Sequence, residues 1–187
     1  MFDLDSYKVR GFEKVSEDEF FKSMIDDIEI ELESLSYDEL LEFESKINSL
    51  YNDIKLPKRK TRGSAGYDFF APYSFDLAPN ESILLPTGIK SYMLEDEVLE
   101  LYPRGSIGFK HFGRLANTVG IVDSDYYNNS SNEGHIFIKL KNEGTGMFSV
   151  EKGDSVVQGI FKQYLTVDNE DEESLEDRTG GFGSTGK

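Results

Sequence analysis

Residues 82–93 read SILLPTGIKSYM, two short and largely apolar stretches on either side of a Pro-Thr-Gly sequence. Similar apolar or alternating runs continue from residue 54 onward, and Gly, Pro, Asn and Asp separate them at close intervals. Short strands divided by turn residues are typical of an all-β sandwich or barrel. The sequence therefore predicts a mainly β body, with a first strand at residues 7–15 and no internal repeat.

Residues 16–53 carry a different pattern. The sequences SEDE (16–19) and SYDE (36–39) each place Ser three residues before Glu, which is the spacing of a helix capping box. Apolar residues follow both sequences at helical spacing. We predict two antiparallel helices at residues 17–34 and 37–52. This acidic helical insert either caps the domain as a solvated hairpin or contacts a protein partner.

The charge of the chain is concentrated in two segments. The formal net charge is −16, from 36 acidic and 20 basic residues. Residues 16–53 hold 13 acids and 2 bases, and residues 168–177 hold 7 acids and no base, which leaves 16 acids and 18 bases elsewhere. A duplex nucleic acid is disfavoured as a ligand because the basic footprint that it needs is absent. A small anion held by a few Arg and backbone N–H groups is compatible with this balance.

Composition excludes several kinds of site. Because the chain has no Cys, disulfides, thiolate metal sites and a Cys nucleophile are excluded, and only two His argue against a His-rich zinc site. No apolar run approaches the roughly 20 residues of a membrane span, and the N-terminus does not resemble a signal peptide. We therefore expect a single cytoplasmic domain over residues 1–187 with no membrane contact.

Five segments set polar residues and glycines tightly against predicted strands. They are SAGYDFFA (64–71), YPRGSIGFK (102–110), NTVGIVDSDYY (117–127), KGDSVVQGIF (152–161) and DRTGGFGSTGK (177–187). Taken alone, Asp68 reads as an Asx-type turn at a strand start, and residues 104–106 read as a short phosphate cradle. Residues 117–127 suit either a hairpin with Asp turn residues or a site with an Asp general base. Gln158 is the one polar side chain on its strand, so it either satisfies backbone groups or binds a ligand.

The C-terminus reads as a tethered arm. Residues 168–177, DNEDEESLED, are predicted to form a solvated acidic linker, because they contain seven acids and one apolar residue. Residues 178–187 follow as a glycine-rich segment with one aromatic ring, one Arg and several hydroxyls. Glycine N–H groups are unobstructed by side chains and suit a phosphate. We predict a flexible arm that closes over a ligand.

In this order, the five segments resemble the five motifs of the trimeric dUTPase family, the dUTP nucleotidohydrolases. The resemblance covers residues 54–187, and residues 7–15 fit the family's first strand. It implies a small β-barrel or jelly roll that forms a homotrimer, with active sites at subunit interfaces and the arm closing each site. The implied reaction is the Mg²⁺-assisted hydrolysis of dUTP to dUMP and pyrophosphate, which limits uracil in DNA and supplies dUMP for dTMP synthesis.

The resemblance also assigns the nucleoside contacts. Asp123 matches the carboxylate that activates water, and Tyr126 matches the ring that packs on deoxyribose and leaves no room for a 2′-hydroxyl. The hairpin that reads uracil through its backbone corresponds to Asn117, Val119, Gly120 and Val122.

The phosphate contacts follow from the remaining motifs. The residues implied at the phosphates are Arg104, Gly105, Ser106 and Gln158. Asp68 matches an acid that supports the Mg²⁺–triphosphate through water. In the arm, Arg178 matches the γ-phosphate ligand and Phe182 the ring that stacks on uracil, with phosphate contacts implied for Gly183, Ser184 and Thr185.

The chain departs from the family pattern in three places. Gly105 stands where a second Ser is common, and Arg178 and Phe182 are one residue closer together than usual. Residues 127–136, YNNSSNEGHI, replace a tight turn, and we expect a surface loop there. Two other functions stay open: a dCTP deaminase on the same barrel, and a regulatory protein that captures a partner through residues 16–53.

Overall fold

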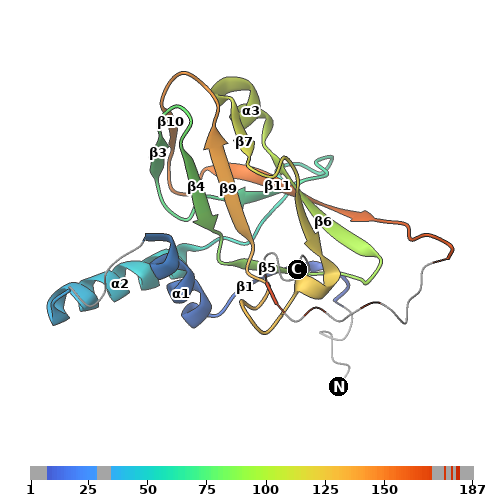
Figure 1. Ribbon diagram of the computed structural model, residues 1–187, viewed down its shortest axis with the longest axis horizontal. Helices are drawn as coiled ribbons and strands as arrows, with labels where there is room; N and C mark the ends of the chain where they lie inside the picture. Colours follow the sequence, from blue (N-terminus) through green and yellow to red (C-terminus); the bar gives the residue numbers. More distant parts are fainter. Residues whose placement is uncertain (1–7, 29–34, 170–174, 176–177, 179, 182–187) are drawn as a thin grey trace.

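The computed structural model describes residues 8–28, 35–169, 175, 178 and 180–181. Figure 1 shows a body of short strands, with two helices at one side and a third, short helix at one end. All the strand pairings are antiparallel. The prediction of a mainly β body is confirmed. Within the described part of the chain, no helix is long and apolar enough to span a membrane.

The largest sheet is built around one central pair of strands. Strand β6 (Glu97–Pro103) pairs along its whole length with β11 (Ser155–Gln163). Strand β2 (Tyr67–Phe70) lies on the far side of β11, and β8 (Gly120–Asp123) lies on the far side of β6. The resulting order is β2-β11-β6-β8, so β8 is an edge strand.

Three smaller sheets complete the barrel. They are β4-β9-β7, β1-β5 and β3-β10. Their bounds are Ser82–Pro86 for β4, Phe137–Asn142 for β9, Gly113–Leu115 for β7, Gly11–Lys14 for β1, Ile89–Tyr92 for β5, Phe75–Leu77 for β3 and Phe148–Val150 for β10. Successive side chains of a strand face opposite ways, and alternate residues of β9 are buried accordingly. The buried side chains form one continuous core that includes Phe69, Leu99 and Leu140.

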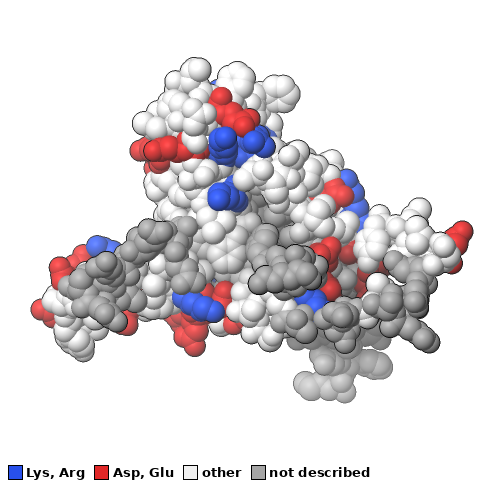
Figure 2. All heavy atoms as spheres, in the orientation of Figure 1, with Lys and Arg blue, Asp and Glu red and all other residues white. Residues whose placement is uncertain are grey.

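The helical insert consists of α1 (Glu17–Ile28) and α2 (Tyr37–Asp53). The second helix lies within one residue of its prediction, whereas the end predicted for the first falls among residues 29–34, outside the described residues. The short helix α3 (Gly105–His111) was not predicted, because seven residues with two glycines carry too little helical period. Acidic side chains are visible on the described part of the insert in Figure 2.

The insert shares apolar packing with the barrel. Phe20, Met24 and Ile47 form a small cluster with Val15, and Ile54 packs against both this cluster and the main core. An ion pair between Lys152 and Asp53, at 2.6 Å, adds a polar tie. The insert is therefore continuous with the barrel rather than a separately solvated hairpin.

The two predicted capping boxes differ in outcome. At α2, Ser36 and Glu39 exchange both hydrogen bonds, as predicted. At α1, the Ser16 hydroxyl accepts from the Glu19 N–H at 3.1 Å, but the Ser16 N–H donates to Glu133 at 2.9 Å. A carboxylate from residues 127–136 therefore replaces the partner that the sequence pattern predicts.

The expectation of a surface loop at residues 127–136 is wrong for its second half. His135 is fully buried and Ile136 is 1% exposed. The His135 ring lies 6.4 Å from the Phe20 ring of α1, and its Nε2 accepts from the Gly88 N–H at 2.8 Å. Its Nδ1 lies 3.5 Å from a Glu19 carboxylate oxygen. Burial lowers the pKa of His135 to about 3.

Replacing Phe20 with Ala tests whether the insert is part of the cooperative fold. Phe20 is fully buried, so we expect the substitution to lower the free energy of unfolding by about 3–5 kcal/mol. The control is Tyr37→Ala in α2, where a side chain that is 75% exposed should change stability by less than about 0.5 kcal/mol. Urea unfolding at equal chain concentration measures both. A loss below about 1 kcal/mol for Phe20→Ala would contradict shared packing.

Stability should depend on pH through His135. The unfolded histidine takes up a proton below its ordinary pKa of 6.5, whereas the native one stays neutral until about pH 3. The contribution of neutral His135 to the free energy of unfolding is therefore fully present above pH 6.5. It is lost as pH falls, by up to about 1.4 kcal/mol per pH unit.

Chemical unfolding between pH 7.5 and 5 measures the slope of the free energy of unfolding against pH. His135→Gln, whose side-chain oxygen is still able to accept from Gly88, should flatten it. The control His111→Gln, which changes the exposed histidine of α3, should retain it. Equal slopes in the wild type and His135→Gln would contradict the assignment.

Candidate active site

The phosphate residues implied by the sequence gather at one end of the β6–β11 pair. Gln158 of β11 is the register partner of Asp68 in β2 and of Tyr102 in β6. Arg104 follows β6 directly, and its Nε lies 3.3 Å from the Asp68 carboxylate. Gly66 is needed here because a Cβ at that position would lie 2.6 Å from the Gln158 amide oxygen. Asp68, Arg104 and Gln158 thus form one polar cluster, which we call the phosphate half.

Gly105 and Ser106 are exposed at the start of α3, beside Arg104. Arg104 is the residue before the first helical turn, and its carbonyl accepts from the Ile107 N–H at 3.0 Å. A Cβ on Gly105 would meet only Phe109, at 3.9 Å. A serine would therefore fit at residue 105, so its absence has no steric cause.

The segment predicted to read the base forms a turn into β8. Asn117 is exposed in this turn, and Thr118 adopts a left-handed conformation with φ of 67°. The expected hairpin is not a hydrogen-bonded one, because β7 pairs with β9 whereas β8 pairs with β6. Since β8 is an edge strand, its outer backbone groups lie outside the ladders of the described strands.

Two of the residues that the sequence assigns to uracil have no side chain available to a ligand, so only their backbone groups could serve the predicted role. The Val122 side chain is 7% exposed and belongs to the core. A Cβ on Gly120 would lie 3.0 Å from the Leu101 side chain of β6, which keeps this position small. Val119 is partly buried in the turn, where its N–H donates to the Asn117 carbonyl at 2.7 Å. The role predicted for this segment at the base would therefore fall to backbone groups other than the Val119 N–H.

Two exposed carboxylates stand at the end of β8. Asp123 is the last residue of β8, and Asp125 lies in the 3₁₀ turn Ser124–Tyr126. The guanidinium of Arg178 donates to Asp123 at 2.7 Å and to Asp125 at 2.8 Å. Arg178 thus forms ion pairs with two carboxylates and does not lie in the phosphate half. Asp125 was missing from the predicted site, although the Asp-Ser-Asp spacing signalled a second acid.

Tyr126 lies beneath the same guanidinium, whose central carbon is 5.5 Å from the ring centroid. The residue is 6% exposed, and burial raises the pKa of its hydroxyl. That hydroxyl donates to the His135 carbonyl at 2.9 Å and accepts from the Asn132 amide at 2.8 Å. We call Asp123, Asp125 and Tyr126, with Arg178, the carboxylate half. Its ring and carboxylates are held in fixed relative positions.

The arm is described only in part. Gly180 and Gly181 are partly buried, and a Cβ on Gly181 would lie 2.9 Å from the Ser131 hydroxyl. The remaining arm residues that the sequence assigned to substrate, which are Phe182, Gly183, Ser184 and Thr185, lie outside the described residues.

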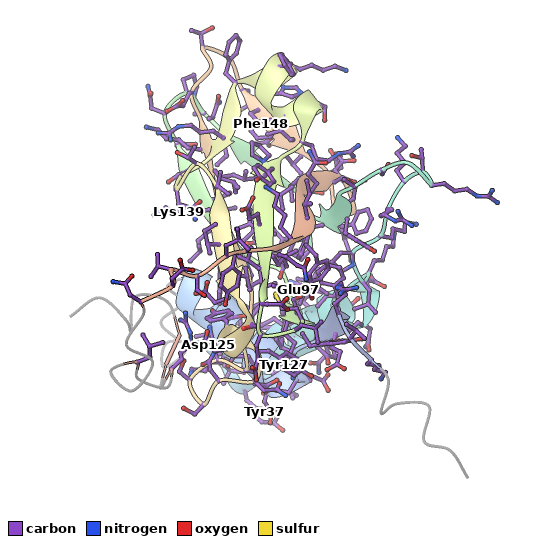
Figure 3. The ribbon with its side chains drawn as sticks, turned by 90° about the vertical axis from the view of Figure 1, so that its right-hand side faces the viewer. Tyr37, Glu97, Asp125, Tyr127, Lys139 and Phe148 are labelled. Atoms are coloured by element: carbon purple, nitrogen blue, oxygen red, sulfur yellow. The ribbon has the colours of Figure 1, made fainter. Side chains whose placement is uncertain are left out.

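The two halves stand far apart on one chain. Asp123 is the register partner of Val98, whereas Arg104 follows the other end of β6. Six residues of extended strand separate Val98 from Arg104, or roughly 20 Å. The labelled Asp125 lies toward the end of the molecule opposite Phe148 in Figure 3, and α3 lies near Phe148. A general base must lie within hydrogen-bond reach of its target, directly or through one water. One chain therefore does not bring Asp123 to a phosphate held by Arg104.

The described site residues of the two halves lie outside the cavity between α2 and β2. A cavity of about 330 Å³ between α2 and β2 is lined by residues such as Leu50, Phe69 and Lys152, and by none of the predicted site residues. Among the described residues, no group of three or more His, Cys or acidic side chains could hold a metal ion.

Comparison with known proteins identifies the family of the chain. The dUTPase family model matches residues 52–186. The deoxyuridine 5'-triphosphate nucleotidohydrolase of Lactococcus lactis is 48% identical over 133 residues, which cover 71% of this chain and 89% of that protein. The crystal structure of dUTPase from Streptococcus mutans matches with a TM-score of 0.57 and 44% identity, covering 61% of this chain and 89% of the other.

A more distant structure shares the fold. A mutant dUTPase from phage phi11 of S. aureus, which coordinates a structural Mg(II) ion, matches with a TM-score of 0.53 at 20% identity, covering 65% of this chain and 92% of the other. The match of the family model to more than half of the chain is decisive. The chain belongs to the dUTPase family, whose members act on dUTP as diphosphatases.

Proposed function

We propose that the chain hydrolyses dUTP to dUMP and pyrophosphate in the cytoplasm, through a water activated by Asp123. The observation that carries the proposal is the grouping of an exposed Asp123 with the Tyr126 ring at the end of an edge strand. A carboxylate is the natural base here, because the chain has no Cys and its two His lie elsewhere. The reaction would limit uracil in DNA and supply dUMP for dTMP synthesis.

The three parts of the nucleotide suit three parts of the structure. The outer backbone of β8 is available to pair with uracil, and the Tyr126 ring is positioned to support the deoxyribose. The phosphate half supplies Arg104 and the Gln158 amide, and the first turn of α3 adds the Ser106 hydroxyl. Fixed donors of this kind stabilise charge that develops on the phosphates.

Arg178 must change partners when the substrate binds. The Asp123 carboxylate accepts a hydrogen bond from the Arg178 guanidinium, so this oxygen is engaged by Arg178 rather than by a water. A triphosphate carries more negative charge than the two carboxylates and competes for the same guanidinium. Binding of dUTP would then draw Arg178 to the γ-phosphate and release Asp123. The arm would close in the same step.

Mg²⁺ fits the phosphate half as a substrate-bound ion. Mg²⁺ usually keeps several waters and is held by one or two carboxylates together with substrate phosphates. Asp68 is the carboxylate of this half, and it is already balanced by Arg104, which suits contact through water rather than direct ligation. The bound ion would offset negative charge on the triphosphate.

The separation of the two halves supports an assembly in which neighbouring chains share each site. The family resemblance suggests a homotrimer, and a cyclic trimer would bring the carboxylate half of one chain to the phosphate half of the next. Three complete sites would form at the three interfaces. No described contact of the insert tests the expectation of a protein partner at residues 16–53, which stays a prediction.

Pyrophosphate release across the deoxynucleoside triphosphates tests the activity. With Mg²⁺ present, we expect release from dUTP and little from dTTP, dCTP or UTP. Asp123→Asn should lower kcat by about 10²- to 10⁴-fold with dUTP affinity nearly unchanged, because the general base is lost and the contacts remain. Asp125→Asn, the matched change at the other Arg178 partner, should lose much less. Ammonia release from dCTP, or a retained rate in Asp123→Asn, would overturn the proposal.

Mixing two inactive variants tests whether neighbouring chains share a site. Asp123→Asn and Arg104→Gln, refolded together in equal amounts, should regain about one quarter of the wild-type activity, since random assortment leaves that share of interfaces with both halves intact. Asp68→Asn mixed with Arg104→Gln is the control, because both changes fall in the same half. No recovery in the first mixture would place the whole site within one chain.

A further inference from the structure

Residues 127–136, the long loop after Tyr126, form a self-supported scaffold built on Asn129. The Asn129 amide group donates to the Tyr126 carbonyl at 2.9 Å and to the Asn132 side-chain oxygen at 2.8 Å. Its own side-chain oxygen accepts from the Ser131 N–H, the Ser131 hydroxyl and the Asn132 N–H, at 2.8–3.2 Å. Hydrogen bonds to local backbone fix the shape of such a loop. The loop is therefore a defined structure attached to Tyr126.

Asn132 holds the far end of the same tyrosine. Its amide group donates to the Tyr126 hydroxyl at 2.8 Å, and that hydroxyl donates to the His135 carbonyl at 2.9 Å. The Asn132 side-chain oxygen accepts from the Gly134 N–H at 3.2 Å. Gly134 has φ of +81°, and a Cβ there would lie 2.5 Å from the Tyr126 carbonyl. Tyr126 is thus held at its backbone by Asn129 and at its hydroxyl by Asn132.

The described part of the arm lies against the same side chains. A Cβ on Gly181 would lie 2.9 Å from the Ser131 hydroxyl and 3.3 Å from the Asn132 amide nitrogen. Asn132 therefore lies close to both the Tyr126 ring and the backbone of the arm. The carboxylates of the site are on the adjoining turn, where Arg178 covers the ring. The ring and the arm are held by one set of side chains.

We propose that Asn132 is a positioning residue for this reaction, which fixes the Tyr126 ring at the sugar and seats the arm at Gly181. The assignment rests on the proposed function, in which Tyr126 supports the deoxyribose and leaves no room for a 2′-hydroxyl. A ring whose hydroxyl is held by both Asn132 and the His135 carbonyl keeps its distance from the sugar. A ring that has lost the Asn132 hydrogen bond yields more readily to an additional hydroxyl. Asn132 therefore sets the discrimination between dUTP and UTP without touching the nucleotide.

Asn132→Ala tests the positioning role. We expect kcat/KM for dUTP to fall roughly tenfold, and the dUTP-to-UTP ratio of kcat/KM to fall by a similar factor, because the Tyr126 hydroxyl loses one of its two hydrogen bonds. Asn48→Ala, which removes an exposed asparagine of α2, is the matched control and should leave both values unchanged. Thermal unfolding and oligomer size confirm that both variants fold. A folded Asn132→Ala with unchanged selectivity would overturn the assignment.

A double-mutant cycle tests the seat of the arm. Gly181→Ala places a methyl group against Ser131, so KM for dUTP should rise severalfold. Ser131→Ala removes the opposing hydroxyl, and the double variant should regain part of the lost affinity. Additive effects of the two changes would show that the arm does not dock on this loop.

Binding measurements separate the failure of this assignment from that of the proposed function. A wild-type chain that fails to hydrolyse dUTP would refute the proposed function. The dissociation constants of dUTP and UTP, measured by calorimetry on the wild type and Asn132→Ala, need no turnover. An affinity ratio that is the same in both would overturn the positioning role, and a ratio that falls in the variant would support it.

Discussion

The antiparallel ladder between β6 and β11 is the constraint on which the site depends. It runs from Glu97 to Pro103, so its two ends lie far apart, and each end carries one half of the site. The end at Pro103 brings Asp68, Arg104 and Gln158 together by register alone. The other end pairs Val98 with Asp123 and holds this carboxylate away from the phosphate half. Because a sheet strand is stiff over this length, the proposed reaction, with Asp123 as base, would need a second copy of the chain.

Part of this arrangement could be predicted from sequence because it is local. Alternation and turn residues predict the strands, and Ser36 and Glu39 form the capping box that their spacing predicts. The five motifs predict the site residues, but not the distance between the two halves, since that distance depends on which strands pair. The change of partner at Ser16 could not be predicted, because Glu133 lies 117 residues away. Asn132 was missed for the same reason: its role comes from the folded loop and from no spacing of its own.

Charge explains how so acidic a chain accommodates a polyanionic substrate. The acids are concentrated in the insert and the linker, and the rest of the chain is close to neutral. In the described carboxylate half, Arg178 already neutralises much of the charge on Asp123 and Asp125. In the phosphate half, Asp68 is paired with Arg104. Under the proposed function, a triphosphate would meet carboxylates that are already partly neutralised, which costs less than bringing an anion to unpaired carboxylates.

The insert is better understood as a support for the site than as an independent attachment. Its first helix begins at Ser16, whose N–H and hydroxyl both donate to Glu133. Lys90 of β5 binds the same carboxylate, and Phe20 packs beside His135, the residue whose carbonyl accepts from the Tyr126 hydroxyl. Few residues therefore connect α1 to Tyr126. Hydrogen bonds form the contact at Ser16 and the contact at the Tyr126 hydroxyl. A ligand that moved the start of α1 would have to break the Glu133 contacts, and residues 127–136 would then lose a support for the ring. The helices, the loop and the tyrosine consequently form one mechanical unit, in which the insert adds rigidity at the ring that the proposed function places against the sugar.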